Sequence, residues 1–233
     1  MDNRNLTLYY TNIDTNLSPM ISESYINLVS LERKEKIRRF HNNDDKKRAL
    51  YGAIMVRGLL QEIYGINAMK YTLKMNEYGK PYFKEMSTPH FNISHSGNYI
   101  LCGFHEKELG IDIEIISTYY EDIAHNHFTK QEYMTLCQMP QSERTKMFYT
   151  YWTLKESYVK YLGKGLSVPL DSFSFCKIDD EFFLEYSRHD RNVRHFCELF
   201  KDEYMIAATC SQNVEKIRIE YRNILDFQHI LLP

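Results

Sequence analysis

Two acidic residues separated by a single isoleucine stand in the segment Gly110-Ile-Asp-Ile-Glu114. In a β-strand, successive side chains point to opposite faces, so Asp112 and Glu114 share one face and the isoleucines share the other. Two carboxylates above a buried apolar face suit a hard divalent cation such as Mg²⁺, which prefers oxygen ligands. The pattern also fits an ordinary half-exposed strand with solvated acids, so both interpretations stay open on this segment alone.

A second group of reactive side chains lies in Trp152-Thr-Leu-Lys-Glu-Ser-Tyr-Val-Lys160. On a helix, Trp152, Glu156 and Lys160 are four residues apart and form one stripe. The stripe presents an acid beside a base. The alternative interpretation is an exposed ion pair on a helix, which is worth only ~0.3–0.5 kcal/mol.

Two further segments offer contacts for phosphate. Ser94 and His95 follow Phe91-Asn-Ile, where a strand is expected to end and polar side chains can donate to phosphate oxygens. The basic stretch that contains Arg33 and Lys36 could hold another phosphate. A structural histidine and a solvated helix face are the corresponding alternatives.

The first part of the chain contains elements that could position these groups. An apolar face recurring at helical spacing predicts a helix over residues 44–64, which ends before Gly65, a C-cap residue. The stretch of residues 32–40 is also expected to be helical. Strands are predicted over residues 6–11, 71–75, 91–94, 99–105 and 110–116, with a turn over 76–81.

The second part repeats this layout. Thr129 with Glu132 forms a capping-box pattern for a helix to about Cys137, and a long helix is expected from Ser142 to Leu162, before Gly163. Short β-like runs follow over residues 172–178, 182–186, 193–200 and 203–209. We therefore predict an α+β fold with two pseudo-symmetric halves, residues 1–105 and 106–233, each a small, mainly antiparallel sheet packed with a long helix.

Composition excludes several classes of function. Hydrophobic residues make up 43% of the 233-residue chain and charged residues 26%, with a net charge of −2, so no nucleic-acid or membrane partner is indicated. The five cysteines are scattered, which favours reduced thiols and a cytoplasmic protein. No signal-peptide pattern and no apolar run of ~18 residues is present.

Taken together and in this order, the motifs resemble those of the 4′-phosphopantetheinyl transferases, in particular the longer, two-halved type that activates surfactin synthetase and other nonribosomal peptide and polyketide synthases. The matching segments are Gly79-Lys-Pro81, Phe91-Asn-Ile-Ser-His-Ser96, Gly110-Ile-Asp-Ile-Glu114 and Trp152-x-x-Lys-Glu-Ser-x-x-Lys160. The resemblance spans roughly residues 31–175, and the last two patterns, about 40 residues apart, are its most specific part.

The resemblance implies a role for each matching residue. Asp112, Glu114 and Glu156 would coordinate Mg²⁺ together with the diphosphate of coenzyme A, and Lys160 would contact that diphosphate. Further phosphate contacts are implied for the set Arg33, Lys36, Lys80, Ser94 and His95, with the first two at the 3′-phosphate. Two departures from the family pattern are Arg33, where lysine is frequent, and Ala49, where the resemblance implies a hydroxyl residue that contacts a phosphate.

The implied reaction moves the phosphopantetheine group of coenzyme A to a serine of an acyl or peptidyl carrier protein, converting the apo to the holo form. The proton acceptor is Glu156 or Glu132, and the sequence leaves that choice open. Two alternatives are a Mg²⁺-dependent phosphohydrolase or nucleotidyltransferase and a non-catalytic module that binds coenzyme A or a carrier protein. Because two fused halves can form one cleft between them, we expect a monomer.

Overall fold

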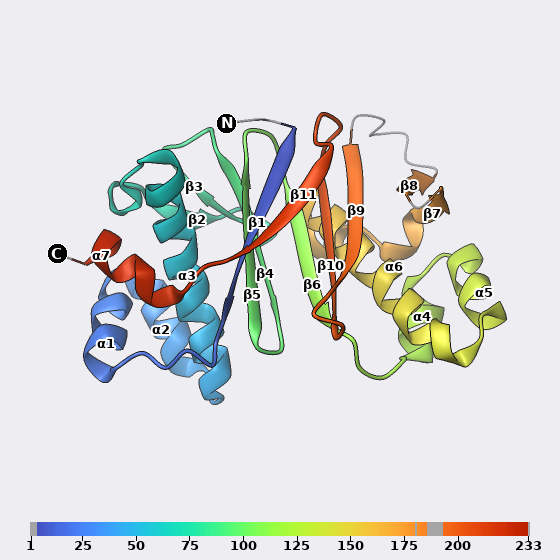
Figure 1. Cartoon of the computed structure of the whole chain (residues 1–233), viewed down its shortest axis with the longest axis horizontal. Coiled ribbons are helices and arrows are strands. Elements are labelled where there is room, and N and C mark those ends of the chain that lie inside the picture. The colour runs from blue at the N-terminus through green and yellow to red at the C-terminus, as the bar shows by residue number, and fades with distance from the viewer. Residues whose placement is uncertain (1–3, 180, 186–192, 233) are drawn as a thin grey trace.

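The computed structural model describes residues 4–179, 181–185 and 193–232, which form two main sheets with helices on their outer sides. In Figure 1 the long strands lie in the middle of the molecule, with one group of helices at the left and another at the right. Helices and mainly antiparallel strands in two halves confirm the expected α+β class.

The first half contains a four-stranded sheet with the order β11-β1-β5-β4, where β11 is the segment Lys216–Tyr221 near the end of the chain. Of its strand pairs, β1–β11 is parallel and the other two are antiparallel. The long helix α3 packs against β5 and ends at Gly65, whose φ of 65° glycine adopts without strain. The elements of this half before the chain crosses over are β1 (Asn5–Asn12), α1 (Pro19–Asn27), α2 (Leu31–Arg39), α3 (Asn43–Tyr64), β2 (Leu73–Met75), β3 (Pro81–Phe83), β4 (His90–Ser96) and β5 (Tyr99–His105).

The second half contains a five-stranded antiparallel sheet with the order β6-β10-β9-β8-β7. Its long helix α6 packs against β6 and β10 and ends at Gly163, again with a left-handed φ of 66°. The elements are β6 (Gly110–Ile115), α4 (Glu121–His127), α5 (Lys130–Gln138), α6 (Gln141–Leu162), β7 (Ser174–Ile178), β8 (Glu181–Glu185), β9 (Val193–Phe200) and β10 (Tyr204–Ser211).

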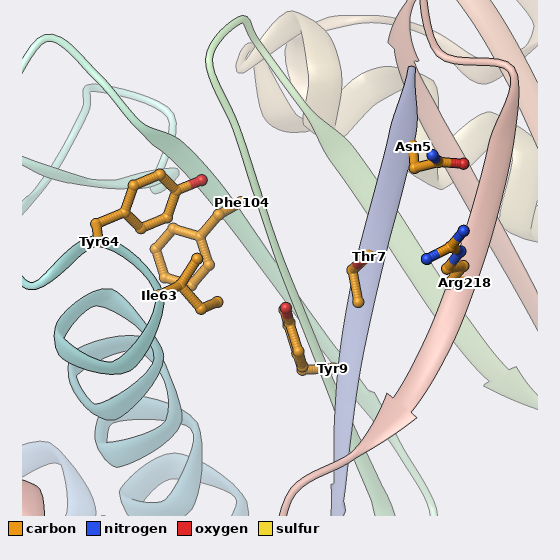
Figure 2. A pocket seen from close by; sticks show the side chains of 7 residues that line it. All are labelled: Asn5, Thr7, Tyr9, Ile63, Tyr64, Phe104 and Arg218. Carbon is orange, nitrogen blue, oxygen red and sulfur yellow. The ribbon is translucent and has the colours of Figure 1, made fainter. Parts of the chain in front are cut away.

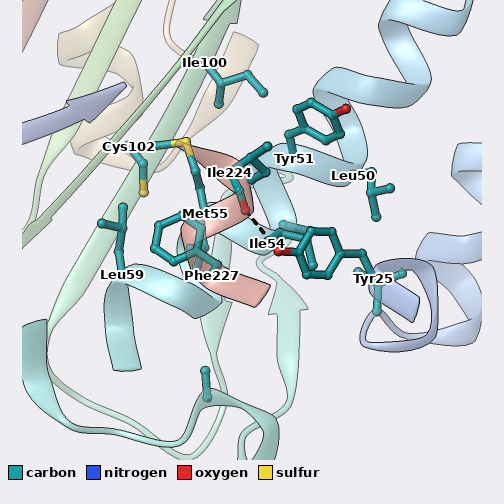
Figure 3. Packing of buried hydrophobic residues seen from close by; sticks show 14 of the residues in the cluster. Tyr25, Leu50, Tyr51, Ile54, Met55, Leu59, Ile100, Cys102, Ile224 and Phe227 are labelled. Carbon is teal, nitrogen blue, oxygen red and sulfur yellow. Dashed lines mark hydrogen bonds between the residues drawn. The ribbon is translucent and has the colours of Figure 1, made fainter. Parts of the chain in front are cut away.

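The C-terminal end of the chain returns to the first half, which the sequence analysis did not anticipate. β11 (Lys216–Tyr221) pairs with β1, and α7 (Gln228–Leu231) packs against α3. Figure 3 shows Ile224 and Phe227 among the apolar side chains of α3, where the Tyr25 hydroxyl donates to the Ile224 carbonyl at 2.9 Å. The tail thus follows the second half in the sequence but pairs with the sheet of the first half, and such pairing between distant strands leaves no local signal.

A shared apolar cluster joins the two halves. It combines residues of β1 and β5, such as Leu8 and Leu101, with Ile111 and Ile113 of β6 and Ile206 of β10. The edge strands β4 and β6 lie next to each other, and side chains connect them: the Asn92 amide oxygen accepts from the Ile111 amide at 2.9 Å. The change from the first sheet to the second therefore falls between two neighbouring edge strands.

Smaller differences from the expected elements have local causes. The capping box of Thr129 and Glu132 is present, whereas α6 begins at Gln141 after Pro140 and has no side-chain cap. The elements β3, α1 and α4 were not predicted. β3 has three residues and α4 has seven, which is too few for a clear periodicity. Tyr186, the end of one predicted strand, lies outside the described residues. Among the helices described, none has the length and apolar character needed to cross a membrane.

Candidate active site

The two acids of β6 lie at the seam between the halves, on the face opposite the shared apolar cluster. Asp112 is 2% exposed, and its Oδ1 accepts hydrogen bonds from Ser94 Oγ at 2.8 Å and Lys160 Nζ at 2.6 Å. Glu114 Oε2 accepts from Ser96 Oγ at 2.8 Å. Strand alternation thus places both acids on one face, as predicted, and β4 supplies a hydroxyl to each of them.

The stripe of α6 faces these acids. Lys160 Nζ lies 2.6 Å from Asp112 Oδ1 and 2.9 Å from Ser94 Oγ, and Glu156 is close enough to Asp112 for their charges to interact. The indole of Trp152, one helical turn before Glu156, hydrogen-bonds to Glu114. The stripe is therefore not a solvated ion pair on one helix, because Lys160 pairs with an acid from another element.

Close packing between α6 and the start of β6 sets this geometry. A Cβ at Gly110 would come within 1.9 Å of the Ser157 carbonyl oxygen and 2.2 Å of the Tyr161 nitrogen, so only glycine permits this approach. Ser157 is fully buried between helix and sheet and lies 3.0 Å from the Thr209 hydroxyl. Small side chains thus bring the helix near enough for Lys160 to reach Asp112.

Burial and mutual repulsion raise the pKa values of the neighbouring acids. Burial, and then the charge of Asp112, raise the pKa of Glu114 to about 7, against the opposing effects of Ser96, Lys160 and Trp152. The same two causes raise the pKa of Glu156, while Lys160 opposes them. A cluster that resists full ionisation is typical of sites that bind a cation or move a proton.

The three acids fit a divalent cation in donor type and in charge. Asp112 Oδ2 is buried and has no hydrogen-bond partner among the residues that the structure describes, and each of the other acids repels Asp112. Oxygen donors of this kind suit Mg²⁺. Their side chains are not gathered around one point, since no set of three His, Cys, Asp or Glu residues in the described ranges is arranged to hold a metal ion.

A pocket of about 240 Å³ opens beside the acids, between the β2–β3 hairpin and the last turns of α6. Glu156 and Lys160 line one side, and Gly79, Lys80 and Pro81 line another. The pocket therefore brings together two motifs that are about 80 residues apart in the sequence. It is a concave space next to convergent polar groups, which is the usual form of a small-molecule site.

The ammonium group of Lys80 is bound by protein groups, which differs from the phosphate contact that we expected. Its Nζ lies 2.6 Å from Glu108 Oε2 and also donates to the carbonyls of Leu109 at 3.2 Å and Tyr161 at 3.4 Å. Lys80 is among the residues that line the pocket, and its charge is directed at the end of α6 and at the loop before β6.

Glu132, the second candidate for the proton acceptor, is buried and already bound by protein groups. It is 1% exposed, its Oε2 lies 2.8 Å from Lys155 Nζ, and its Oε1 accepts from the Phe175 amide at 3.0 Å. Lys155, fully buried on the face of α6 away from the acids, also donates to the Leu170 and Phe173 carbonyls. Of the two candidates for the base, only Glu156 lies near Asp112 and Lys160.

The residues expected at the phosphates lie around the start of α3. Arg33 donates to the Ala49 carbonyl at 3.2 Å, and Lys36 is exposed on α2. Arg48, which the sequence analysis missed, donates to the Gly97 carbonyl at 2.7 Å and is near His95. Burial, and then the charges of Arg48 and Lys160, lower the pKa of His95. Both cations already have an acid partner, since Arg48 lies 2.7 Å from Asp45 and Lys160 lies 2.6 Å from Asp112. No motif identified Arg48, since its place depends on how α3 packs on the β4–β5 turn.

A second pocket, of about 280 Å³, lies on the first half and is lined by Asn5, Thr7, Tyr9, Ile63, Tyr64, Phe104 and Arg218. Figure 2 shows these side chains between the end of α3 and the strands β1 and β11. Among the described residues that line it, none carries a carboxylate and none belongs to the motifs. The acid cluster and its adjoining pocket are therefore the better candidate for an active site.

Two family models match the chain and together cover most of it. The model described as the 4′-phosphopantetheinyl transferase superfamily matches residues 108–209, and the model described as 4′-phosphopantetheinyl transferase, N-terminal, matches residues 18–105. The two matches correspond to a two-halved transferase whose acid and lysine motifs lie in the second half. The chain belongs to the 4′-phosphopantetheinyl transferase family.

Two sequence relatives agree with this assignment. The 4′-phosphopantetheinyl transferase Sfp of Bacillus subtilis (strain 168) is 39% identical over 169 residues, which cover 72% of this chain and 75% of the relative. The 4′-phosphopantetheinyl transferase gsp of Aneurinibacillus migulanus is 37% identical over 183 residues, covering 78% and 75%. A solved holo-(acyl-carrier-protein) synthase from Bacillus anthracis, in complex with CoA (3′,5′-ADP), is 21% identical with a TM-score of 0.39 and covers 44% of this chain and 92% of that one.

Proposed function

We propose that this chain transfers the 4′-phosphopantetheinyl group from coenzyme A to a serine hydroxyl of an acyl or peptidyl carrier protein, in a Mg²⁺-dependent reaction. The observation that carries the proposal is the convergence of Asp112, Glu156 and Lys160 beside a pocket between the halves. The family assignment supports the reaction class. Carrier domains of peptide synthetases are the acceptors we expect, by resemblance to the two-halved type.

Coenzyme A would bind along the seam, with its phosphates toward the edge that carries Arg48, His95 and Lys160. Arg33 and Lys36 are proposed to contact the 3′-phosphate, and Arg48 and His95 would add two donors at that edge. Lys160 is the cation proposed for the diphosphate. In the free protein its ammonium is shared between Asp112 and Ser94, so it is already held at the acids.

The serine oxygen attacks the phosphorus nearer the pantetheine, and the bond from that phosphorus to the adenosine 3′,5′-bisphosphate oxygen breaks. A neutral hydroxyl attacks a polyanion slowly, because charge repels the nucleophile and accumulates on the leaving group. Lys160 reduces both effects by placing a positive charge at the developing negative charge. Glu156 accepts the serine proton, directly or through water.

Asp112, Glu114 and Glu156 are the residues proposed to hold Mg²⁺. The bound ion would neutralise phosphate charge and polarise the reacting phosphoryl group. The protein contributes the acids on two rigid elements, a strand and a helix, and excludes water by burying Asp112. The buried, unpartnered oxygen of Asp112 is the observation that favours a cation here over a solvated acid pair.

A single assay tests the function. The chain is incubated with coenzyme A, Mg²⁺ and an apo carrier protein, and the carrier is weighed by mass spectrometry. A mass gain equal to one phosphopantetheinyl group on the active serine supports transfer. Release of adenosine 3′,5′-bisphosphate without a gain would support hydrolysis, and no change in either would support a binding module. Omitting Mg²⁺ or adding a chelator should stop the reaction if the metal assignment holds.

A further inference from the structure

The β2–β3 hairpin of the first half contacts the C-terminal end of α6 in the second half. Asn76 Nδ2 donates to the Gly163 carbonyl at 2.7 Å, and Asn76 Oδ1 accepts from the backbone nitrogens of Tyr78 and Lys80 at 2.9 and 2.8 Å. The hairpin turn is thus closed by the side chain that reaches the helix. A contact between halves that ends at a helix C-cap constrains the last turn of that helix.

Lys80 adds an ionic contact at the same place. Its ammonium has three N–H donors, and its three acceptors are Glu108 Oε2, the Leu109 carbonyl and the Tyr161 carbonyl. The Lys80 side chain is 15% exposed. Because every donor already has a protein acceptor, a phosphate could bind this ammonium only by displacing one of them. A cation at the carbonyl end of a helix is also favourable on its own.

Packing leaves little space for the helix end to move. A Cβ at Gly163 would come within 3.2 Å of Lys80 Cδ, and one at Gly165 within 3.1 Å of the Tyr78 carbonyl oxygen. On its other side, the same helix end touches the backbone of Gly110. The last turn of α6 is therefore held between β6 and the hairpin.

We propose that Lys80 is a positioning residue of the transferase. Lys80 belongs to the hairpin and contacts both Glu108 and the end of α6, and these contacts keep Lys160 in position beside Asp112. Lys160 directly precedes Tyr161, whose carbonyl Lys80 contacts, and its ammonium reaches Asp112 at 2.6 Å. Loss of these Lys80 contacts lets the last turn of α6 fray and moves the ammonium group of Lys160 away from Asp112. The inference rests on the proposed function, and it replaces the phosphate contact expected for Lys80.

The test compares Lys80→Met, which removes the charge and keeps most of the stem, with Glu108→Ala and with the double variant. A positioning role predicts that each single variant lowers kcat by about 10- to 100-fold, the effect of a misplacement of about 1 Å, with little change in the KM for coenzyme A. The double variant should be no slower than the slower single variant, because both remove the same contact. Lys80→Arg should restore part of kcat.

Lys201 provides a matched control, because it also joins the halves but on the opposite face of the sheets. Its ammonium lies 5.4 Å from the Tyr10 ring centroid, 5.3 Å from that of Tyr99 and 5.6 Å from that of Phe200. Lys201→Met should leave kcat and KM unchanged. Amide hydrogen exchange gives a readout that needs no activity: residues 160–163 should exchange faster in Lys80→Met and Glu108→Ala than in Lys201→Met.

Three results would overturn the proposal. A raised KM for coenzyme A in Lys80→Met, with normal kcat and no effect of Glu108→Ala, would restore Lys80 as a phosphate ligand. Additive losses in the double variant would show that the two residues act separately. Unchanged amide hydrogen exchange of residues 160–163 in Lys80→Met and Glu108→Ala would also contradict the proposal. This result holds even if the preparation has no transferase activity. Absence of transfer by the unmodified chain would instead count against the proposed function.

Discussion

At the scale of single residues, Asp112 has more consequences than any other acid of the site. It binds Lys160 and Ser94 through one oxygen, keeps the other oxygen buried, and raises the pKa values of Glu114 and Glu156. Burial is the larger cause of both raised pKa values, and the charge of Asp112 is the second. A substitution that removes the charge of Asp112 but keeps the size of its side chain tests the electrostatic role alone.

We expect Asp112→Asn to lower the rate of transfer by about 100-fold or more, the loss typical when one electrostatic partner of a transition state is removed. The amide is nearly the same size, so the fold should remain. The check is the transfer rate beside a thermal melt. A variant with the rate of the unmodified protein would contradict the assignment of Asp112 to the metal and the diphosphate.

The burial of His195 makes the free energy of unfolding depend on pH. It is 5% exposed, its Nδ1 lies 2.9 Å from Thr209 Oγ1, and burial lowers its pKa to about 3. Unfolding exposes the imidazole and returns its pKa to its ordinary value of 6.5, so the unfolded chain binds the extra proton between these two values. The contribution of His195 to stability is therefore present above pH 6.5 and is lost as the pH falls, by at most ~1.4 kcal/mol per pH unit.

The measurement is the free energy of unfolding in urea at several pH values for the unmodified chain and His195→Gln. Glutamine does not titrate, so the variant should be less stable at neutral pH but should lose less on acidification. Parallel curves for the two proteins would show that His195 does not carry this dependence.

At the scale of elements, α6 serves two environments on opposite faces. One face presents Glu156 and Lys160 to the acids, and the other buries Lys155, which pairs with Glu132 of α5 at 2.8 Å. The consecutive residues Lys155 and Glu156 in one motif thus have different roles. The buried pair ties α5, α6 and the start of β7 together, because Glu132 also accepts from the Phe175 amide.

We expect Glu132→Gln to destabilise the fold by about 3–5 kcal/mol, because it leaves the buried charge of Lys155 without its partner. Transfer per folded molecule should change little. Urea unfolding and the transfer assay give the two quantities. The double variant with Lys155→Met should recover part of the stability. A large loss of rate with unchanged stability would return Glu132 to the list of candidate bases.

At the scale of the whole molecule, the site exists only because the halves are joined at several places. The shared apolar cluster, the side-chain contacts between β4 and β6, and the hairpin grip on α6 all cross the seam. The C-terminal tail completes the first half, where a Cβ on Gly58 would come within 2.2 Å of the Phe227 ring. Truncation of the tail therefore affects the half that begins the chain.

Phe227→Ala should destabilise the protein by about 3–5 kcal/mol, the usual cost of removing a buried phenylalanine ring. Phe227 is fully buried against α3. The free energy of unfolding in urea measures this loss. Phe183, which is 44% exposed, serves as the control, and Phe183→Ala should stay within about 0.5 kcal/mol of the unmodified chain. Equal losses for the two variants would contradict the packing of the tail.

The sequence by itself determined what depends on near neighbours. The alternation in β6 placed Asp112 and Glu114 on one face, the four-residue spacing aligned Glu156 with Lys160, and glycines marked the ends of α3 and α6. These features follow from local backbone geometry, so a few adjacent residues contain all the information needed to infer them.

Only the tertiary structure decided which distant residues meet. The acid partner of Lys160 is Asp112, 48 residues away. Lys155 pairs with Glu132, and Lys80 pairs with Glu108. The pairing of β11 with β1 is likewise a contact between segments that are far apart in the sequence. Such pairings depend on how whole elements pack and on which charges are buried together, and no local spacing encodes either. The motifs therefore predicted the chemistry, while packing assigned each charged group its partner.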